Sequence, residues 1–254
     1  MWPIIVIALN TFRENLRDRI LYNLLLFAVL LMGASLLLAD LSIMEHYKIM
    51  TDMGLAAINL VGVIIAIFVG IGLVSKEIER RTIYTIIARP ISRAQFIVGK
   101  YFGLVTTLTV NVVVMLAVYL ATLWAFHAPI HWALVQAVQL IVVELMLVTA
   151  VALFFSTFSS ATLSAILTIG VYIIGHLTTD LRGIVQNSRS DAIKAAVNAV
   201  YYLCPNLDIL NMKGQAAMGI AMSLSFQALA TAYGLLYAGM LIVGACLIFQ
   251  RRDF

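Results

Sequence analysis

Long runs of apolar residues, separated by shorter polar stretches, are the main pattern along the chain. A helix that crosses a bilayer needs about 20 consecutive, mostly apolar residues. Six runs come close to this length, and the fifth is the shortest. They cover residues 20–39, 54–74, 101–126, 133–155, 160–177 and 229–249. The pattern therefore predicts an all-α membrane protein with six transmembrane helices.

The composition excludes a soluble globular protein. Of the 254 residues, 63% are hydrophobic and only 11% are charged, whereas about 25% of the residues in a soluble domain are charged. So few charges cannot cover the surface of a soluble core. Six spans and their connections use the whole length, so residues 1–254 are predicted to form a single transmembrane domain.

The basic residues predict the orientation of the chain. Six spans place both termini on one side, and 11 of the 16 Lys and Arg residues then fall on that side. They are Arg13, Arg17, Arg19, Lys76, Arg80, Arg81, Arg89, Arg93, Lys100, Arg251 and Arg252. Cytoplasmic segments carry such an excess, so both termini are predicted to be cytoplasmic. Because these residues flank spans, where anionic headgroups attract them, the net charge of +4 indicates a lipid bilayer as the partner and no nucleic acid.

Residues 1–19 predict a short helix ahead of the first span. Pro3 suits a first helical turn, and apolar and charged residues recur on opposite sides at helical spacing. The apolar side has Ile5, Leu9, Phe12 and Leu16, and the charged side has Arg13, Glu14, Arg17 and Asp18. We expect either an elbow helix lying in the membrane interface or an N-terminal extension of the first span.

The charged connection at residues 75–100 predicts two short cytoplasmic helices. Ser75 can cap the first one, and Glu77 and Glu79 in its first turn suit the helix dipole. Pro90 ends this helix, so the chain is expected to hinge at Arg89–Ile91. The connection is either a surface that a soluble partner grips or a solvated loop that only orients the protein.

The second helix of this connection is predicted to continue into the third span. Ser92, followed by Gln95 three residues later, is a capping-box signal for its start. Gly99 and Gly103 lie four residues apart within it, a spacing that permits close packing of another helix.

The connection at residues 178–228 is expected on the extracytoplasmic side and is too apolar for a plain linker. Apolar residues recur at helical spacing over Asp191–Leu203, and Pro205 stops the pattern. A second weakly polar stretch at 214–228 leads into the last span and suits an interfacial or re-entrant helix.

Several kinds of chemistry are missing from the sequence. No G-x-x-x-x-G-K-[ST] segment occurs, so the chain has no P-loop for ATP, and neither H-E-x-x-H nor G-x-S-x-G is present. Two cysteines cannot form a disulfide framework or a four-cysteine metal site. The four histidines map to the outer half of the topology without close ligand spacing; they are His46, His127, His131 and His176. No catalytic residue and no metal site are therefore predicted.

Glu144 lies at the middle of the fourth predicted span, and Asn111 lies at a similar depth in the third. A charged acid there costs about 2.5 to 3.5 kcal/mol on insertion scales. Glu144 therefore belongs to a substrate pathway or proton relay, or it is a protonated acid hydrogen-bonded between helices. An intramembrane enzyme using Glu144 with His176 is another hypothesis, although His176 lies near the outer end of the fifth predicted span.

Three segments resemble bacterial ABC-2 type transporter permeases. The run from Lys76 to Lys100 is similar to the cytoplasmic loop of these proteins, with charged residues, then Thr82, then aliphatic residues and the Pro90-Ile-Ser-Arg93 step. Tyr201–Leu207, with Pro205 and Asn206, is similar to an outer segment in one branch of the family, and the end at 249–254 is typical as well.

The resemblance implies a type V exporter-like fold, in which two six-span subunits, here a homodimer, form the pathway. Each subunit docks a separate cytoplasmic ATP-binding cassette subunit, which binds ATP and Mg, so this chain needs no cofactor and is not itself an enzyme. The residues implied in coupling are Lys76, Glu77, Glu79, Arg80, Arg81, Thr82, Arg89, Pro90 and Arg93. The implied location is the bacterial inner membrane. Some relatives belong to systems that mature copper enzymes. An ATPase-independent channel or scaffold is the remaining alternative.

Overall fold

The computed structural model describes residues 2–40, 46–79, 92–186, 195, 197–199, 201–202 and 204–251. Its regular elements are all helical. They are α1 (Trp2–Leu16), α2 (Arg19–Asp40), α3 (His46–Glu79), α5 (Arg93–Ala125), α6 (Trp132–Ser156), α7 (Ala161–Gln186), the 3-10 turn η1 (Asp208–Leu210), α9 (Lys213–Ala217) and α10 (Leu224–Arg251). The predicted all-α fold class is confirmed.

Five of the described helices are long and apolar enough to cross a membrane. They are α3, α5, α6, α7 and α10, so five of the six predicted spans have a matching helix. The described apolar part of α2, Leu21–Ala34, is shorter. The chain is thus a multi-pass membrane protein.

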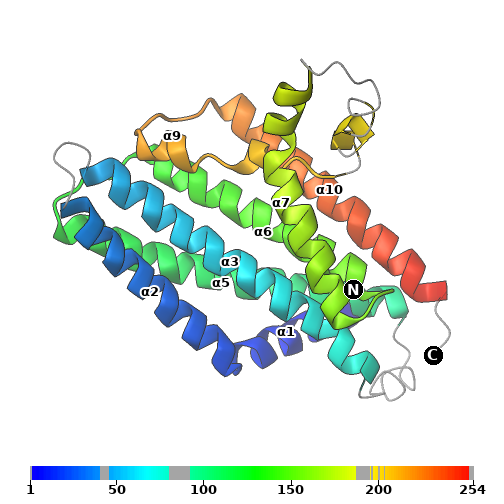
Figure 1. Cartoon of the computed structure of the whole chain (residues 1–254). Helices are drawn as coiled ribbons and strands as arrows, with labels where there is room; N and C mark the ends of the chain where they lie inside the picture. Colours follow the sequence, from blue (N-terminus) through cyan, green and yellow to red (C-terminus); the bar gives the residue numbers. More distant parts are fainter. Residues whose placement is uncertain are drawn as a thin grey trace.

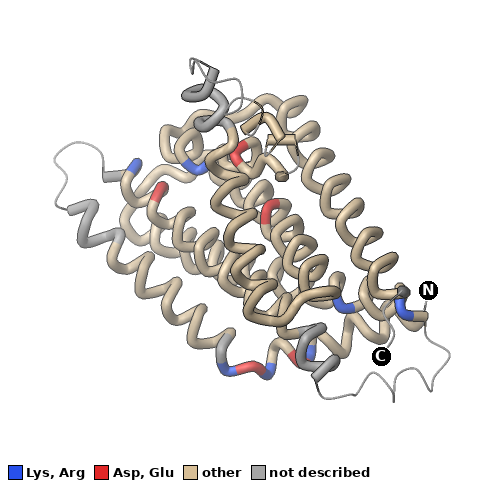
Figure 2. The backbone as a smooth tube through the Cα atoms, turned by 45° about the vertical axis from the view of Figure 1, so that its right-hand side comes forward, with Lys and Arg blue, Asp and Glu red and all other residues tan. Residues whose placement is uncertain are grey.

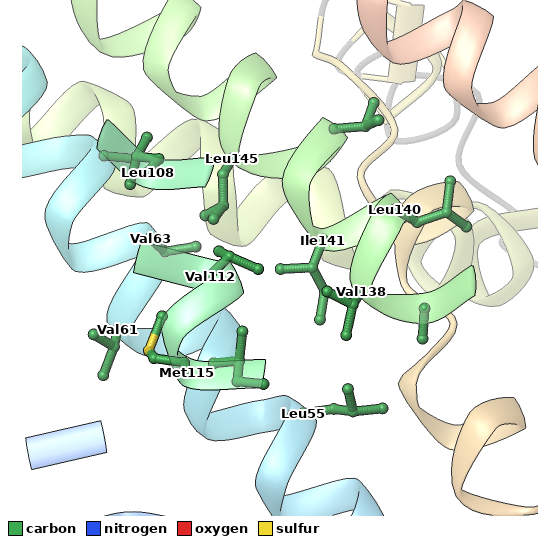
Figure 3. Close-up of a cluster of buried hydrophobic side chains, with 14 of the residues drawn as sticks. Leu55, Val61, Val63, Leu108, Val112, Met115, Val138, Leu140, Ile141 and Leu145 are labelled. Atoms are coloured by element: carbon green, nitrogen blue, oxygen red, sulfur yellow. The ribbon is translucent and has the colours of Figure 1, made fainter. Parts of the chain in front are cut away.

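α3 and α6 form the centre of the bundle. In each of them 72% of the most apolar stretch is buried within the chain, against 22% in α7 and 28% in α10. Apolar residues cover α6 on every side, as expected for a helix surrounded by other helices. Figure 3 shows side chains of α3, α5 and α6 meeting in this core, including Val63, Val112 and Leu145.

The two ends of the bundle are chemically distinct from its middle. The start of α1 and the end of α10 lie at the same end of the bundle (Figure 1). We call this the terminal end; it includes residues 17–19, 93–100 and 249–251. The far end includes 46–50, 126–132 and 204–223, where the rings of Tyr47 and His131 lie 5.4 Å apart. The described Lys and Arg residues lie at these two ends (Figure 2).

The prediction that Ser75 caps a separate helix is wrong. α3 runs without a break from His46 to Glu79, so Ser75 lies inside it. A new helix at Ser75 would leave backbone N–H groups without partners, whereas continuing α3 keeps its hydrogen bonds and uses good helix formers such as Lys76 and Glu77. The second capping signal is confirmed: Ser92 Oγ accepts from the Gln95 N–H at 3.2 Å, and the Ser92 N–H donates to Gln95 Oε1 at 3.1 Å.

α1 and α2 are separate helices that meet at Arg17–Asp18. Figure 1 shows α1 running at an angle to α2 across the terminal end. A side chain at Gly99 would collide with Ile7, and one at Gly103 would collide with Thr11. The two glycines therefore let α1 lie directly against α5, as their spacing predicts.

The face of α1 that packs on α5 differs from the predicted apolar face. Thr11 and Asn15 are buried, while Ile5 and Leu9 are 58% and 51% exposed within this chain. Two apolar surfaces compete for this helix in a membrane, the protein and the lipid. The small and polar residues take the close contact with α5, and the larger aliphatic ones remain free to meet lipid.

The segment before α10 is less helical than predicted. Over residues 214–228 the chain forms the last residues of the short helix α9, a non-helical stretch, and the first turns of α10, which begins at Leu224. Gly219, with φ +71°, ends α9 next to the ring of His131. Of the predicted helix at Asp191–Leu203, the described positions between 195 and 202 are helical, and the others lie outside the described residues.

Candidate functional site

The predicted coupling residues fall into three groups. Lys76, Glu77 and Glu79 lie on the last turns of α3, which continues as a helix to Glu79, past the end of the predicted span at residue 74. Arg80, Arg81, Thr82, Arg89 and Pro90 lie outside the described residues. Arg93 is the first residue of α5.

Arg93 connects the start of α5 to the end of α10. Its Nη1 donates to the backbone carbonyls of Phe249 and Gln250, at 3.3 and 3.2 Å. These carbonyls belong to the last turn of α10, where a cation is favoured by the helix dipole and by oxygens that lack partners within the helix. The rings of Phe96 and Phe249 stack beside this contact at 6.2 Å.

Lys100 fastens α1 to the same end of α5. Its side chain is only 5% exposed, and its Nζ lies 3.7 Å from Glu14 Oε2 and 5.7 Å from the centre of the Phe96 ring. Further along the same two helices, Asn15 Nδ2 of α1 donates to Thr107 Oγ1 of α5 at 3.2 Å. Sequence reasoning counted Lys100 only as a basic residue, although its place next to Gly99 in the close-packing motif was a signal of this contact.

The start of α5 is therefore a junction of several elements. It is capped by its own residues, holds α1 through glycine contacts and Lys100, and holds α10 through Arg93.

Glu144 lies at the centre of α6, as the 13th of its 25 residues, and is completely buried. Asn59 Nδ2 from α3 donates to both carboxyl oxygens at 3.3 Å. His176 Nε2 from α7 lies 3.4 Å from Glu144 Oε1. Three helices thus meet at one buried polar cluster.

The depth that the sequence suggested for His176 differs from the depth it has in the structure. The fifth predicted span ends at residue 177, which put His176 near the outer end and away from Glu144. α7 in fact continues to Gln186, so His176 lies well inside the helix. This removes the geometric objection to a Glu144 and His176 pair.

Asn111 is buried in α5, and its Nδ2 donates to the Thr107 carbonyl of its own helix at 2.9 Å. The amide that reaches Glu144 is instead Asn59, which sequence reasoning did not single out. Its place as a polar amide within the second predicted span was the available signal. Choosing between the two amides required knowing which helix packs against α6 at this depth.

Pro205 and Asn206 lie in a segment that packs against α7 and α10. The Asn206 N–H donates to the Tyr233 hydroxyl at 2.8 Å, and the Asn206 side chain accepts from the Asp208 N–H at 3.1 Å. The Leu207 N–H donates to the Gly175 carbonyl at 3.0 Å. A side chain at position 175 would lie 2.7 Å from the Pro205 carbonyl, so only glycine allows this contact.

A glutamine network, also missed from the sequence, joins α6 to the start of α10. Gln136 Nε2 donates to Gln227 Oε1 at 2.9 Å and to the Met222 carbonyl at 3.1 Å. Gln227 Nε2 donates to Gln139, whose own Nε2 donates to Thr231 at 2.8 Å. Amide groups that are satisfied by one another are favourable within an apolar bundle.

Among the residues that the structure describes, no three His, Cys, Asp or Glu side chains gather as metal ligands. His131 packs against Tyr47 at the far end, and His176 belongs to the Glu144 cluster. These polar groups are suited to joining helices and to binding protons.

Comparison with known families decides the class of protein. The family described as ABC-2 family transporter protein matches residues 5–254, which is nearly the whole chain. The chain belongs to the ABC-2 transporter family. A search of curated proteins finds no match. Membership of this ABC-2 family agrees with the apolar helical bundle and indicates the membrane subunit of a transporter.

Proposed function

We propose that this ABC-2 family protein is the permease subunit of an exporter that acts as a homodimer in the bacterial inner membrane. Each copy crosses the membrane six times, with α2 as the first span and both termini in the cytoplasm. A separate ATP-binding cassette subunit binds and hydrolyses ATP with Mg and docks at the terminal end.

The observation that carries this proposal is the structure of the two helix ends that flank the 75–100 connection. α3 extends as a continuous helix to Glu79, and α5 begins at a capped Ser92 whose neighbour Arg93 holds α10. Both flanking helices pack against α6 at the centre of the bundle. A partner that moves this connection therefore moves α3 and α5.

The ATP-binding subunit can drive transport only under one energetic condition. Its ATP-bound, closed state must bind the 75–100 connection with different affinity in the inward-facing and outward-facing conformations, because a ligand with equal affinity for both shifts nothing. The charged residues Lys76 to Arg89 supply the contacts that make this difference.

Purification from native membranes tests the proposal. The tagged chain, extracted in a mild detergent, is expected to bring down an ATP-hydrolysing subunit in a one-to-one ratio. The same complex carrying Glu79→Ala or Arg80→Ala should assemble less well, or should hydrolyse ATP without transport. Arg13→Ala, which removes an exposed arginine of α1 outside the connection, is the matched control. Isolation of the chain without any ATPase, or full assembly and transport by both loop variants, would contradict the proposal.

An intramembrane enzyme remains a less favoured alternative. The contact between Glu144 and His176 gives it a plausible acid and base, but the family match favours a transporter. Detection of an enzymatic activity that Glu144→Gln abolishes would support this alternative.

A further inference from the structure

The hydrogen bond made by His176 determines where one of its ring protons lies. Nδ1 is 3.1 Å from the carbonyl oxygen of Tyr172, one helical turn earlier. A carbonyl oxygen only accepts hydrogen bonds, so Nδ1 carries the proton in this contact. In a neutral imidazole Nε2 is then a bare acceptor.

That bare nitrogen faces another acceptor. Nε2 is buried, lies 3.4 Å from Glu144 Oε1 and makes no hydrogen bond to any described group. A neutral ring and an ionised carboxylate would direct two lone pairs at each other in a buried site. The contact is favourable only when one proton lies between the two atoms, on the ring or on the carboxyl group. Both arrangements have no net charge, which is the least costly state inside a membrane.

The groups around this pair come from several elements. Asn59 from α3 donates to the carboxyl group, and the Tyr172 ring stacks on His176 with centroids 4.6 Å apart. Lys213 is the charged residue at the start of α9. The charged residues on the first turns of α3 and on η1 are Lys48, Asp52 and Asp208. Asn59 and Tyr172 carry no full charge at neutral pH, so the shared proton controls the charge between α6 and α7.

The pair lies beside a second contact of α7. The His176 side chain is 20% exposed, but its Nε2 atom is buried, and Glu144 is not exposed at all. The residue before His176 is Gly175, whose carbonyl accepts from Leu207 and so holds the segment that contains Pro205 and Asn206. The same turn of α7 carries the proton pair and this contact.

We propose that Glu144 and His176 form a proton-binding site inside the bundle, with His176 Nε2 and the Glu144 carboxyl group as the two holders of one proton. With the proton bound, the neutral pair joins α6 to α7. Without it, the two acceptors repel, and the turn of α7 that carries the Leu207 contact is released from α6. This site rests on contacts within the chain and is independent of the function proposed above.

Nitrogen NMR of the full-length protein in lipid nanodiscs tests the site. With ¹⁵N-labelled histidine, the chain gives signals from only four residues, and His176→Gln identifies those of His176. At neutral pH, Nδ1 is expected to carry a proton, and the Nε2 signal is expected to change with pH. In Glu144→Gln the amide can donate to Nε2 but cannot share its proton. The midpoint of the His176 transition should then move by about one pH unit or more, a tenfold change in proton affinity.

Two further variants separate a shared proton from a general loosening of the bundle. Asn59→Leu removes the donor that favours the ionised carboxylate, so the midpoint should move in the sense opposite to that of Glu144→Gln. His131→Gln removes a histidine at the far end and should leave the midpoint in place. A His176 ring protonated on Nε2 alone at neutral pH, or a midpoint unaffected by both Glu144→Gln and Asn59→Leu, would overturn the proposal.

Discussion

The middle of the bundle and its terminal end both use polar contacts, but under opposite conditions. Glu144 is wholly buried among three helices and depends on two partners, Asn59 and His176. At the terminal end, Glu14 is 61% exposed, and Arg93 bonds to carbonyls at a helix end that water also reaches. Losing one buried partner leaves an uncompensated group, whereas losing one exposed partner lets water replace it. Substitutions in the middle of the bundle are therefore expected to reduce the stability of the protein. Polar contacts at the terminal end can be exchanged for contacts with a partner protein.

The largest expected effect is at the buried cluster. His176→Leu leaves Glu144 with Asn59 alone among its described partners and should lower the free energy of unfolding by about 3 kcal/mol at neutral pH. His176→Gln retains a polar side chain and should cost clearly less. Thermal unfolding of both purified variants in the same detergent measures the difference. Equal stability of His176→Leu and the natural chain would show that the cluster does not hold α6 to α7.

A smaller loss is expected where α1 packs on α5. A side chain at position 103 would lie 2.6 Å from Thr11 and 2.7 Å from the Ala8 carbonyl, so Gly103→Leu should destabilise by about 2 kcal/mol through overpacking. Gly33→Leu on α2 is the control, because a side chain there meets nothing within 4 Å. The same thermal assay applies. If the two leucine variants behave alike, α1 does not lie against α5.

These contrasts show which parts of the structure were readable from the sequence. Apolar runs of spanning length predicted five of the long helices, and the Ser92 and Gln95 pair predicted the start of α5, because both signals are local. Glu144 was identified by its charge within an apolar run. His176 was paired with it only in the enzyme hypothesis and at a different depth, and Asn59 was not singled out. These residues lie 32 residues after and 85 residues before Glu144 in the chain, and only helix packing brings them together. Ser75 failed as a cap because the same serine is also tolerated inside a continuing helix.

At the terminal end, Arg93→Ala should change stability little and coupling more. It removes two hydrogen bonds to partly exposed carbonyls, a loss of about 1 kcal/mol. Transport per ATP hydrolysed should fall several-fold, since α10 is no longer fastened to the start of α5. Transport into membrane vesicles, with ATP consumption followed in parallel, measures this ratio, with Arg13→Ala as the control. A drop in stability as large as that of His176→Leu would erase the contrast between the two regions.

The smallest effect concerns Cys204 at the far end. Partial burial raises the pKa of its thiol, so less thiolate is present at neutral pH than in a free cysteine. Maleimide labelling of a Cys246→Ser variant should therefore be a few-fold slower than labelling of free cysteine at pH 7. The rate should rise about tenfold per pH unit until the pH reaches the pKa of the thiol. Labelling at the rate of free cysteine would indicate that water reaches this segment freely.

Site-specific photo-cross-linking in native membranes tests the central claim most directly, which is that a separate ATPase drives this permease through the 75–100 connection. A photo-reactive residue replaces Arg81 in one variant and Lys213, at the far end, in the other. We predict that the Arg81 variant cross-links to an ATP-binding subunit and that the Lys213 variant does not. Cross-linking from both positions, or from Lys213 alone, would contradict the account.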